Sequence, residues 1–360
     1  MTGIDRLGDV MGSEQFKRRA ALGLGGAAAA TVALGGVASA QPTAASEGVD
    51  WESLIPTSAD LSRLKINWTY QAQKALAGGT WSSHIAFSDP DGTLKPAVED
   101  NADRVVEAYS VNKIAVAVAV LDKVDRGLLA LDQRVDVTEA IVIQDTDGIF
   151  GLDGAYPSSV TLGHVLATLL TVSDNTAVRL CGLVVPALEL NEILRSKGFT
   201  ATQVVPVANP NRFFLGTTTP RETFTLLQKL VRGELLSAAS TAHLLTVLRS
   251  LTSFNDGIRA RLTSPERLNV ATKAGWFDDG RNEAGVVFDP QGKPMITYAL
   301  FASGAFRGDT ASHLEDYGAT HPAARARAGI GRAMYDSVLR VTANTPRVFR
   351  SRGHQPYNGG

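Results

Sequence analysis

The order of predicted secondary structure along the chain is the feature that most restricts its fold. Strand patterns lie towards both ends, and a long block of helical patterns separates them. We expect strands at His84–Ser88 and near Arg104–Tyr109, and three more at Asn269–Gly275, Ala284–Phe288 and Met295–Ser303. Such segregation is typical of an α+β fold, in which one antiparallel sheet unites the terminal parts, helices flank it, and the helical block forms a second lobe.

Helical patterns complete this prediction. Leu61–Leu76 and Pro322–Val341 have the pattern of the first and last helices, which we expect to flank the sheet. The segment Ile114–Leu121 is apolar on every side, which predicts a helix buried in the centre of a domain. The sequence Thr219-Pro-Arg-Glu222 is typical of a helix start, in which Thr219 caps the helix and Glu222 completes a capping box.

The first forty residues have the pattern of an export signal. A basic region at Lys17–Arg19 precedes an apolar, Gly-rich stretch that is too short for a membrane span, and Ala38-Ser39-Ala40 has the small-x-small form of a cleavage site. The paired arginines favour twin-arginine export, with a Sec signal as the alternative, and we expect a periplasmic or secreted protein. We expect a signal peptide at 1–40, a leader at 41–58, a folded domain at 59–342 and a disordered tail at 343–360.

Charge and cysteine content restrict the partners. The formal net charge of −1 gives no reason to expect a nucleic acid or an anionic membrane, so we expect a monomer that acts on small molecules. The single cysteine, Cys181, excludes an internal disulfide, and its apolar helical surroundings predict a buried side chain rather than a reactive thiol. No metal-binding motif is present, and we expect neither a metal nor a cofactor.

The segment Ser110-Val-Asn-Lys113 contains a potential nucleophile and a potential base. Residues three apart share a helix face, so a neutral Lys113 amine could accept the proton of the Ser110 hydroxyl. Free backbone N–H groups at a helix start can contribute to an oxyanion hole. The motif is weak alone, because Ser62-Arg-Leu-Lys65 also matches it and each could be an ordinary helix-surface pair.

Two later segments could complete a site for acyl transfer. Ser173-Asp-Asn175 offers a hydroxyl and an amide at the start of a helical segment, although a helix cap explains a Ser or an Asp there equally well. Lys273-Ala-Gly275 places a cation on a predicted strand whose small residues would let a substrate lie along its edge, although it could also be a routine strand end. The combination of all three segments favours covalent catalysis through serine.

With these residues in place, the chain resembles the penicillin-recognising serine hydrolases, and among them the class A β-lactamases, over residues 60–342. The order and spacing of the three segments fit this family and reject Ser62 as the nucleophile. Further stretches are similar to segments of the family that flank its middle motif, close its omega loop and follow its third motif: Thr171–Ala177, Gly216–Pro220 and Arg281–Val287. The resemblance implies the β-lactamase/transpeptidase-like fold.

The resemblance also implies roles for the matching residues. Ser110 would be acylated, with Lys113 as its base, and Ser173 would relay a proton to the leaving group. Asn175 would bind a substrate amide, and Lys273 would support the charge network and a substrate carboxylate. Ala274 and Gly275 would border the substrate, and the N–H groups of Ser110 and Trp276 would form the oxyanion hole.

Two departures from the family pattern bear on activity. Ala274 replaces the usual Thr or Ser of the third motif, which removes one hydrogen bond to a substrate carboxylate at a cost of about 1.5–3 kcal/mol. Residues 193–221 contain no Asp or Glu, so the omega-loop glutamate that activates water for deacylation is missing, and Glu192 and Glu222 only bracket the gap. Without a general base, deacylation should slow by about 10²–10⁴-fold.

We therefore expect an exported serine hydrolase that forms an acyl-enzyme on Ser110 and hydrolyses amide or ester bonds such as those of β-lactams. One alternative is a D,D-peptidase or esterase acting on cell-wall peptides or small esters. A second alternative is a non-catalytic protein that binds β-lactams or peptidoglycan fragments.

Overall fold

The computed structural model describes residues 50, 53–144, 148–308 and 310–342. The chain divides into two units, residues 1–49 and 50–360, and all described residues belong to the second unit. The expected signal peptide, most of the leader and the C-terminal tail lie outside the described residues. Within the described part of the chain, no helix combines the length and the apolar character that a membrane crossing needs.

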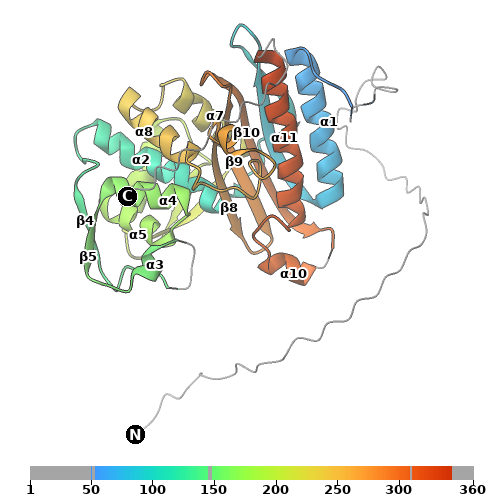
Figure 1. The fold of residues 1–360 in the computed structure, drawn as a ribbon. Coiled ribbons are helices and arrows are strands. Elements are labelled where there is room, and N and C mark those ends of the chain that lie inside the picture. The colour runs from blue at the N-terminus through green and yellow to red at the C-terminus, as the bar shows by residue number, and fades with distance from the viewer. Residues whose placement is uncertain (1–49, 51–52, 145–147, 309, 343–360) are drawn as a thin grey trace, which may run out of the picture. The chain divides into compact units, whose positions relative to one another are not determined.

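A five-stranded antiparallel sheet forms the centre of the fold, with strand order β2-β1-β10-β9-β8 (Figure 1). The first two strands come from the N-terminal part of the chain and the other three from the C-terminal part, as the sequence predicts. The strands are β1 Gly78–Ser88, β2 Leu94–Asp100, β8 Val270–Phe277, β9 Gly280–Phe288 and β10 Pro294–Phe306.

The strand expected near Arg104–Tyr109 is present only as the short β3 (Val106–Glu107), and it is not the strand that follows β1 in the chain. The turn Asp89–Gly92 leads directly into β2, which pairs with β1 and forms the edge of the sheet. The sequence of β2 hides it, because it contains Pro96 and mostly exposed side chains, both of which an edge strand tolerates. Strand β3 pairs instead with β7 in another sheet.

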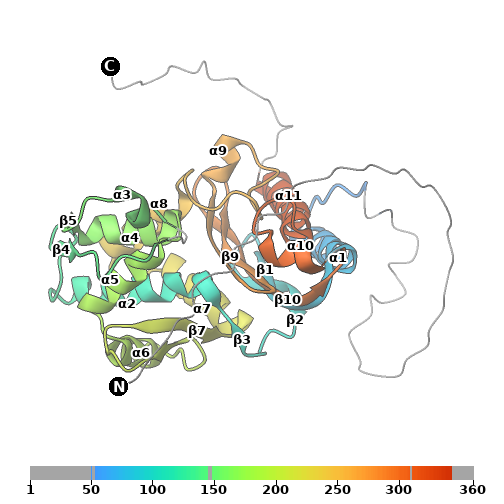
Figure 2. The same cartoon turned by 90° about the horizontal axis from the view of Figure 1, so that it is seen from below.

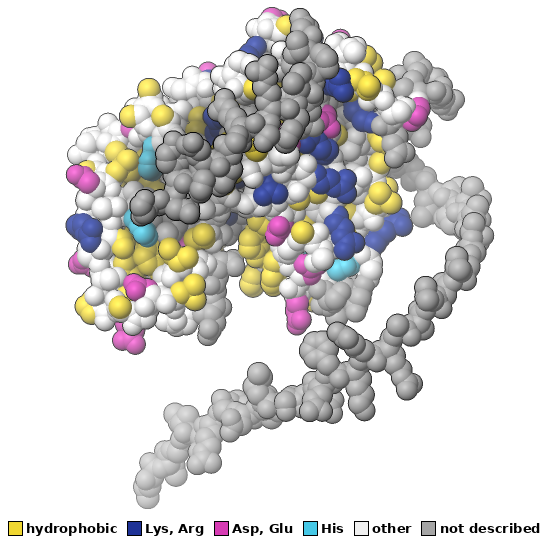
Figure 3. Space-filling view, viewed as in Figure 1, with side chains coloured by type: hydrophobic (Ala, Val, Ile, Leu, Met, Phe, Trp, Pro, Cys, Tyr) yellow, Lys and Arg dark blue, Asp and Glu magenta, His cyan; other side chains and the backbone are white. Residues whose placement is uncertain are grey.

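Helices cover both faces of the sheet (Figure 2). The first and last long helices, α1 and α11, pack side by side on one face, and α7 and α8 pack against the other. In the space-filling view, Lys and Arg side chains gather over α11 and the surface beside it (Figure 3). The four helices span α1 Ala59–Ala77, α7 Pro220–Val231, α8 Ala238–Arg249 and α11 Pro322–Thr342.

The helical lobe is built around α2 (Lys113–Asp125), in which every side chain from Lys113 to Leu121 is buried. This confirms the prediction of a central helix. The other helices of the lobe are α3 Phe150–Asp153, α4 Leu162–Thr171, α5 Asn175–Val184 and α6 Ala187–Ser196. Two short helices, α9 Ser264–Arg267 and α10 Thr310–Glu315, belong to the C-terminal part of the chain. The lobe also contains two short sheets that the sequence did not predict, formed by β3 with β6 Gln203–Pro206 and β7 Phe213–Thr218, and by β4 Arg134–Val137 with β5 Ser158–Thr161.

Two apolar cores hold these layers together. One lies around α2 and reaches the inner face of the sheet, and the other lies between the sheet and the helices α1 and α11. Cys181 is buried in the first core, as predicted, and burial raises the pKa of its thiol to about 12. The thiol therefore stays protonated near neutral pH and acts as an apolar packing group.

The start of α11 contains a buried histidine that should make stability depend on pH. Burial lowers the pKa of His321 to about 3, and nearby Arg281 and His313 contribute to the shift. The ring stays neutral in the folded protein, so its contribution to stability is present above pH 6.5 and is lost as the pH falls from there towards 3. Urea unfolding should show a smaller loss over this window for His321→Asn than for the wild type, and an equal loss in both proteins would contradict this effect.

Candidate active site

Ser110 lies in a short 3-10 turn (Tyr109–Asn112) that precedes α2, rather than in the α-helix that the sequence predicts. In a 3-10 turn, side chains three residues apart eclipse one another, so Ser110 and Lys113 still share one face. The Lys113 N–H donates to the Ser110 carbonyl. Tyr109 has a positive φ of 48°, which turns the chain sharply just before Ser110.

Two asparagines that the sequence analysis missed hold this turn in place. The Asn112 amide donates to the carbonyls of Leu215 and Thr217 on β7, at 2.7 and 2.9 Å. The Asn282 amide on β9 donates to the Glu107 carbonyl at 2.9 Å. The Ser110 turn is thus fixed to both lobes. The one sequence signal for these two asparagines is that each stands inside a segment that resembles the family, Ser110–Lys113 or Arg281–Val287.

Lys113 is completely buried, and its side-chain nitrogen reaches the Ser173 segment. Nζ donates to Ser173 Oγ at 3.1 Å, to Asn175 Oδ1 at 2.8 Å and to the Ser173 carbonyl. The side chains of the first two sequence segments therefore meet at one point.

Ser173 also contacts the third segment. Lys273 Nζ donates to Ser173 Oγ at 3.0 Å and to the Ala274 carbonyl at 2.6 Å. The Ser173 hydroxyl therefore lies between two lysine side chains that come from opposite lobes. Ser173 has a positive φ of 58°, so the hydroxyl is held in place by a turn that few serines adopt.

The sequence analysis offered a helix cap as an alternative explanation of Ser173-Asp-Asn175. This cap is present, and Asp174 provides it. Its carboxylate accepts from the Ala177 N–H at the start of α5 and from the N–H groups of Ile149 and Phe150. Because Asp174 caps the helix, Ser173 is left to contact the lysines. The two explanations of this motif therefore apply to adjacent residues.

Gly275 lets β8 pass directly beside the Ser110 turn. A Cβ atom at position 275 would lie 2.7 Å from both the Ser110 and Val111 nitrogens, which is closer than backbone atoms permit. We expect Gly275→Ala to displace the Ser110 N–H and to reduce the rate of acylation by about 10²-fold, as loss of an oxyanion-hole donor does.

The matched control is Gly163→Ala in α4, where a Cβ would make only ordinary contacts, the nearest at 3.4 Å from the Leu131 carbonyl oxygen. Both positions should be assayed for acylation rate and for unfolding by urea. Acylation of Gly275→Ala at the wild-type rate would contradict this close approach.

The other residues of the third motif take different places. Ala274 is completely buried and pairs with Glu283 across β9. Trp276 is half-buried, and its ring lies 5.5 Å from Phe254 and stacks on Tyr317 at 6.2 Å between centroids. This aromatic wall extends the site beyond the predicted residues.

A cleft of about 890 Å³ opens at Ser110 and Asn175. Apolar side chains line two of its sides, from β6 and β7 (Val205, Phe214 and Leu215) and from β8 and the segment after α10 (Trp276, Phe277 and Tyr317). The charged side chains among the described lining residues are the carboxylates Glu107 and Asp278. The mouth of the cleft is therefore apolar and acidic.

In and around residues 193–221, where the family carries its deacylating glutamate, the polar side chains have structural partners or lie exposed. Glu192 lies exposed on α6, and the Asn209 side chain accepts from the Asn211 N–H within a local turn. Glu222 does not form the expected capping box, although Thr219 caps α7 as predicted. Instead its carboxylate accepts from the N–H groups of residues 200–202, and these hydrogen bonds outweigh burial and lower its pKa.

Comparison with known proteins agrees with this geometry. The family model of the beta-lactamase enzyme family matches residues 72–338. Beta-lactamase AER-1 of Aeromonas hydrophila is 28% identical over 193 residues, which cover 52% of this chain and 62% of that protein. Beta-lactamase OXY-2 of Klebsiella oxytoca is 27% identical over 272 residues, which cover 66% of this chain and 91% of that protein.

Solved structures agree on the fold. A beta-lactamase from Sphaerobacter thermophilus superposes with a TM-score of 0.59 at 24% identity, over 74% of this chain and 94% of that one. The antiparallel sheet, the flanking helices and the helical lobe are thus the β-lactamase/transpeptidase-like fold, which confirms the predicted α+β class. The match to the family model spans most of the chain, and the chain therefore belongs to the beta-lactamase enzyme family, as a class A-like member.

Proposed function

We propose that this protein is an exported serine hydrolase that forms an acyl-enzyme on Ser110 from β-lactams or related amides and esters, and that it releases the acyl group slowly. The observation that carries the proposal is the position of the Ser173 hydroxyl. It lies within hydrogen-bond distance of both Lys113 and Lys273, beside a cleft that Ser110 lines. Family membership adds support, because the matched residues 72–338 include all these side chains.

In the acylation step, the neutral amine of Lys113 takes the proton of Ser110, and Oγ attacks the substrate carbonyl carbon. The N–H groups of Ser110 and Trp276 stabilise the developing oxyanion. When the bond to the leaving nitrogen or oxygen breaks, the Ser173 hydroxyl donates a proton to the leaving atom. The protonated Lys113, 3.1 Å away, returns a proton to Ser173, so the lysine ends neutral and the ester remains.

Deacylation lacks the omega-loop carboxylate that the family resemblance leads us to expect, because residues 193–221 contain no Asp or Glu. A water molecule must lose a proton as it attacks the Ser110 ester, and a carboxylate near the ester is the usual acceptor. Glu222 is held by residues 200–202, and Glu192 lies exposed on α6. This arrangement supports an ester that persists, as expected from the sequence.

Within the D,D-peptidase or esterase alternative, the chemistry of the cleft favours the esterase, because a D,D-peptidase substrate ends in a carboxylate. Glu107 and Asp278 are the charged groups among its described lining residues, and Ala274 supplies no hydroxyl for a substrate carboxylate. An uncharged or cationic ester or peptide would meet less repulsion there than an anionic β-lactam. The non-catalytic binder remains the second alternative and is disfavoured by the retained Ser110, Lys113, Ser173, Asn175 and Lys273.

The proposals on location and assembly have narrower support. Export to the periplasm or medium rests on the basic, apolar and Ala38-Ser39-Ala40 segments near the N-terminus, outside the described residues. A signal of the twin-arginine type remains our preference over a Sec signal. We also propose a monomer that binds no nucleic acid, on the near-neutral charge alone.

Pre-steady-state hydrolysis of a chromogenic cephalosporin and of a nitrophenyl ester tests the proposed function. We expect a burst of product equal to the enzyme concentration, followed by turnover slower by about 10²-fold or more. A burst with the ester alone would select the esterase alternative. Rapid turnover of the cephalosporin without a burst would contradict slow deacylation, and no reaction with either would favour the binder.

A further inference from the structure

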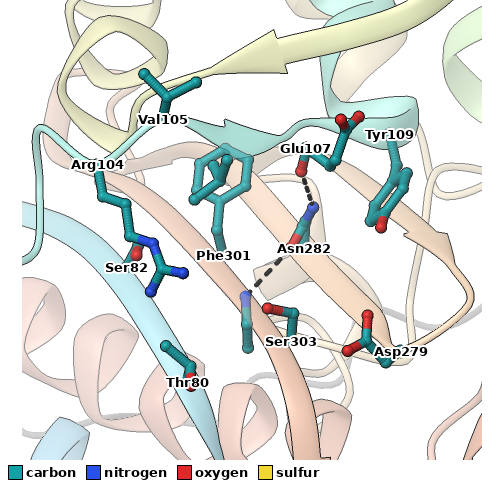
Figure 4. A pocket seen from close by; sticks show the side chains of 12 residues that line it. Thr80, Ser82, Arg104, Val105, Glu107, Tyr109, Asp279, Asn282, Phe301 and Ser303 are labelled. Carbon is teal, nitrogen blue, oxygen red and sulfur yellow. Dashed lines mark hydrogen bonds between the residues drawn. The ribbon is translucent and has the colours of Figure 1, made fainter.

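A second pocket lies next to the catalytic cleft, beside the segment that precedes Ser110 (Figure 4). Its volume is about 270 Å³, and Glu107 and Tyr109 line both cavities. Strands β1 and β10 form its floor, where Thr80 pairs with Ser303. The chemistry at Ser110 uses none of the other residues around this pocket.

A buried hydroxyl group faces this pocket without a partner. Ser82 lines the pocket from β1 and is 1% exposed. Its Oγ has no hydrogen-bond partner among the described residues. Folded proteins satisfy nearly all buried polar atoms, so such an atom in a cavity wall points to a bound molecule that completes it.

Opposite charges border the pocket. Figure 4 shows Arg104 beside Ser82 on one side and Asp279 on the other, with the Ser303 hydroxyl between them. Asp279 is held in place, because its carboxylate accepts from the Gly304 N–H at 2.8 Å. The Arg104 guanidinium makes no hydrogen bond or ion pair with any of the described residues. Glu107 also belongs to the lining, so one available cation and two carboxylates, of which Asp279 is fixed, border the same small space.

The wall between these charges is rigid and partly apolar. Asn282 donates to the Glu107 carbonyl and accepts from the Ala302 N–H, so its amide is already used (Figure 4). Phe301 contributes a buried ring to the floor. The volume is about nine times the share of one liquid water, about 30 Å³, so it admits a molecule of up to about nine heavy atoms.

We propose that this pocket binds a small zwitterion, namely a free amino acid with a short side chain. Its carboxylate pairs with Arg104 and accepts from the Ser82 hydroxyl, and its ammonium group pairs with Asp279. The side chain lies against Phe301. A simple anion would leave Asp279 facing it without a partner, and a simple cation would leave Arg104 in the same position, so only a molecule with both charges matches both sides.

NMR titration of the full chain with glycine and alanine tests this proposal, with acetate and ethylamine as probes that carry one charge each. We expect saturable amino-acid binding in the millimolar range, on the order of 1–10 mM, and at least about tenfold weaker binding of both single-charge probes. Arg104→Gln and Asp279→Asn should each weaken alanine binding by about tenfold, and Ser82→Ala should weaken it severalfold. Arg126→Gln, an exposed change on another surface, should leave it unchanged.

The site is independent of the proposed acyl transfer, so Ser110→Ala protein should bind alanine with unchanged affinity. Arg104 is exposed, and urea unfolding will show whether its variant folds normally. Three results would overturn the proposal: no saturable binding at about 50 mM amino acid, equal affinity for acetate and glycine, or unchanged binding by folded Arg104→Gln protein.

Discussion

Ser110→Ala protein should form no covalent adduct with a β-lactam or an ester and should lose catalysis by about 10⁵–10⁶-fold. Among the described residues that line the cleft, Ser110 is the one serine or threonine, and it shares a face with Lys113. The remaining lysines and N–H groups can hold a substrate but cannot form the ester. Initial rates with the nitrophenyl ester measure this loss directly.

The competing Ser-x-x-Lys segment supplies a matched control. Ser62 is fully buried on α1, and its hydroxyl donates to the Ser58 carbonyl at 2.8 Å, so it has a structural partner. Ser62→Ala should lower the free energy of unfolding by about 1 kcal/mol and leave the adduct unchanged. Loss of the adduct in folded Ser62→Ala protein would show that Ser110 is wrongly assigned as the nucleophile. Retention of the adduct in Ser110→Ala protein would show the same.

Glu283→Gln should lower the free energy of unfolding by about 3–5 kcal/mol, the largest stability effect that we expect from one side chain. Glu283 lies fully buried on β9, 3.2 Å from Arg327 of α11, and accepts from Thr272 and from the Ile258 N–H. Burial raises its pKa, and the charge of Arg327 acts in the opposite direction. Neutralising Glu283 would leave the Arg327 charge buried without its partner.

Urea unfolding checks this effect, with Asp336→Asn as the control. Asp336 pairs with Arg332 on the surface of α11, where such a pair contributes only about 0.3–0.5 kcal/mol. The double variant Glu283→Leu with Arg327→Met should recover most of the lost stability, because it removes both buried charges. Equal effects of Glu283→Gln and Asp336→Asn would contradict the account.

Periodicity and spacing predicted the parts of this molecule that depend on local sequence. The apolar helix Ile114–Leu121, the first and last helices, and the strands of the C-terminal part all appear in the structure close to where we expect them. The three motif segments come together in the structure although they lie far apart in sequence. Their spacing alone did not predict this contact; the family resemblance did, because it implied the fold. Edge strand β2 escaped prediction, since its exposed side chains need no apolar alternation.

The features that depend on tertiary contacts could not be predicted. The anchoring roles of Asn112 and Asn282 arise from carbonyl groups of distant strands, and nothing in their sequence neighbourhoods indicates those partners. Glu222 fits a capping box by spacing, but the loop at residues 200–202 presents N–H groups that bind it more completely. The predictions therefore failed at polar side chains whose hydrogen-bond partners are distant in sequence.

The central claim is that Ser110 forms an ester that the protein releases slowly. Intact-mass measurement of the mature protein over time with a penicillin tests it most directly. We predict an added mass equal to that of the intact penicillin, which persists through many minutes and is absent from Ser110→Ala protein. An adduct that disappears as fast as the penicillin is consumed would contradict slow release, and an adduct on Ser110→Ala protein would contradict the assigned nucleophile.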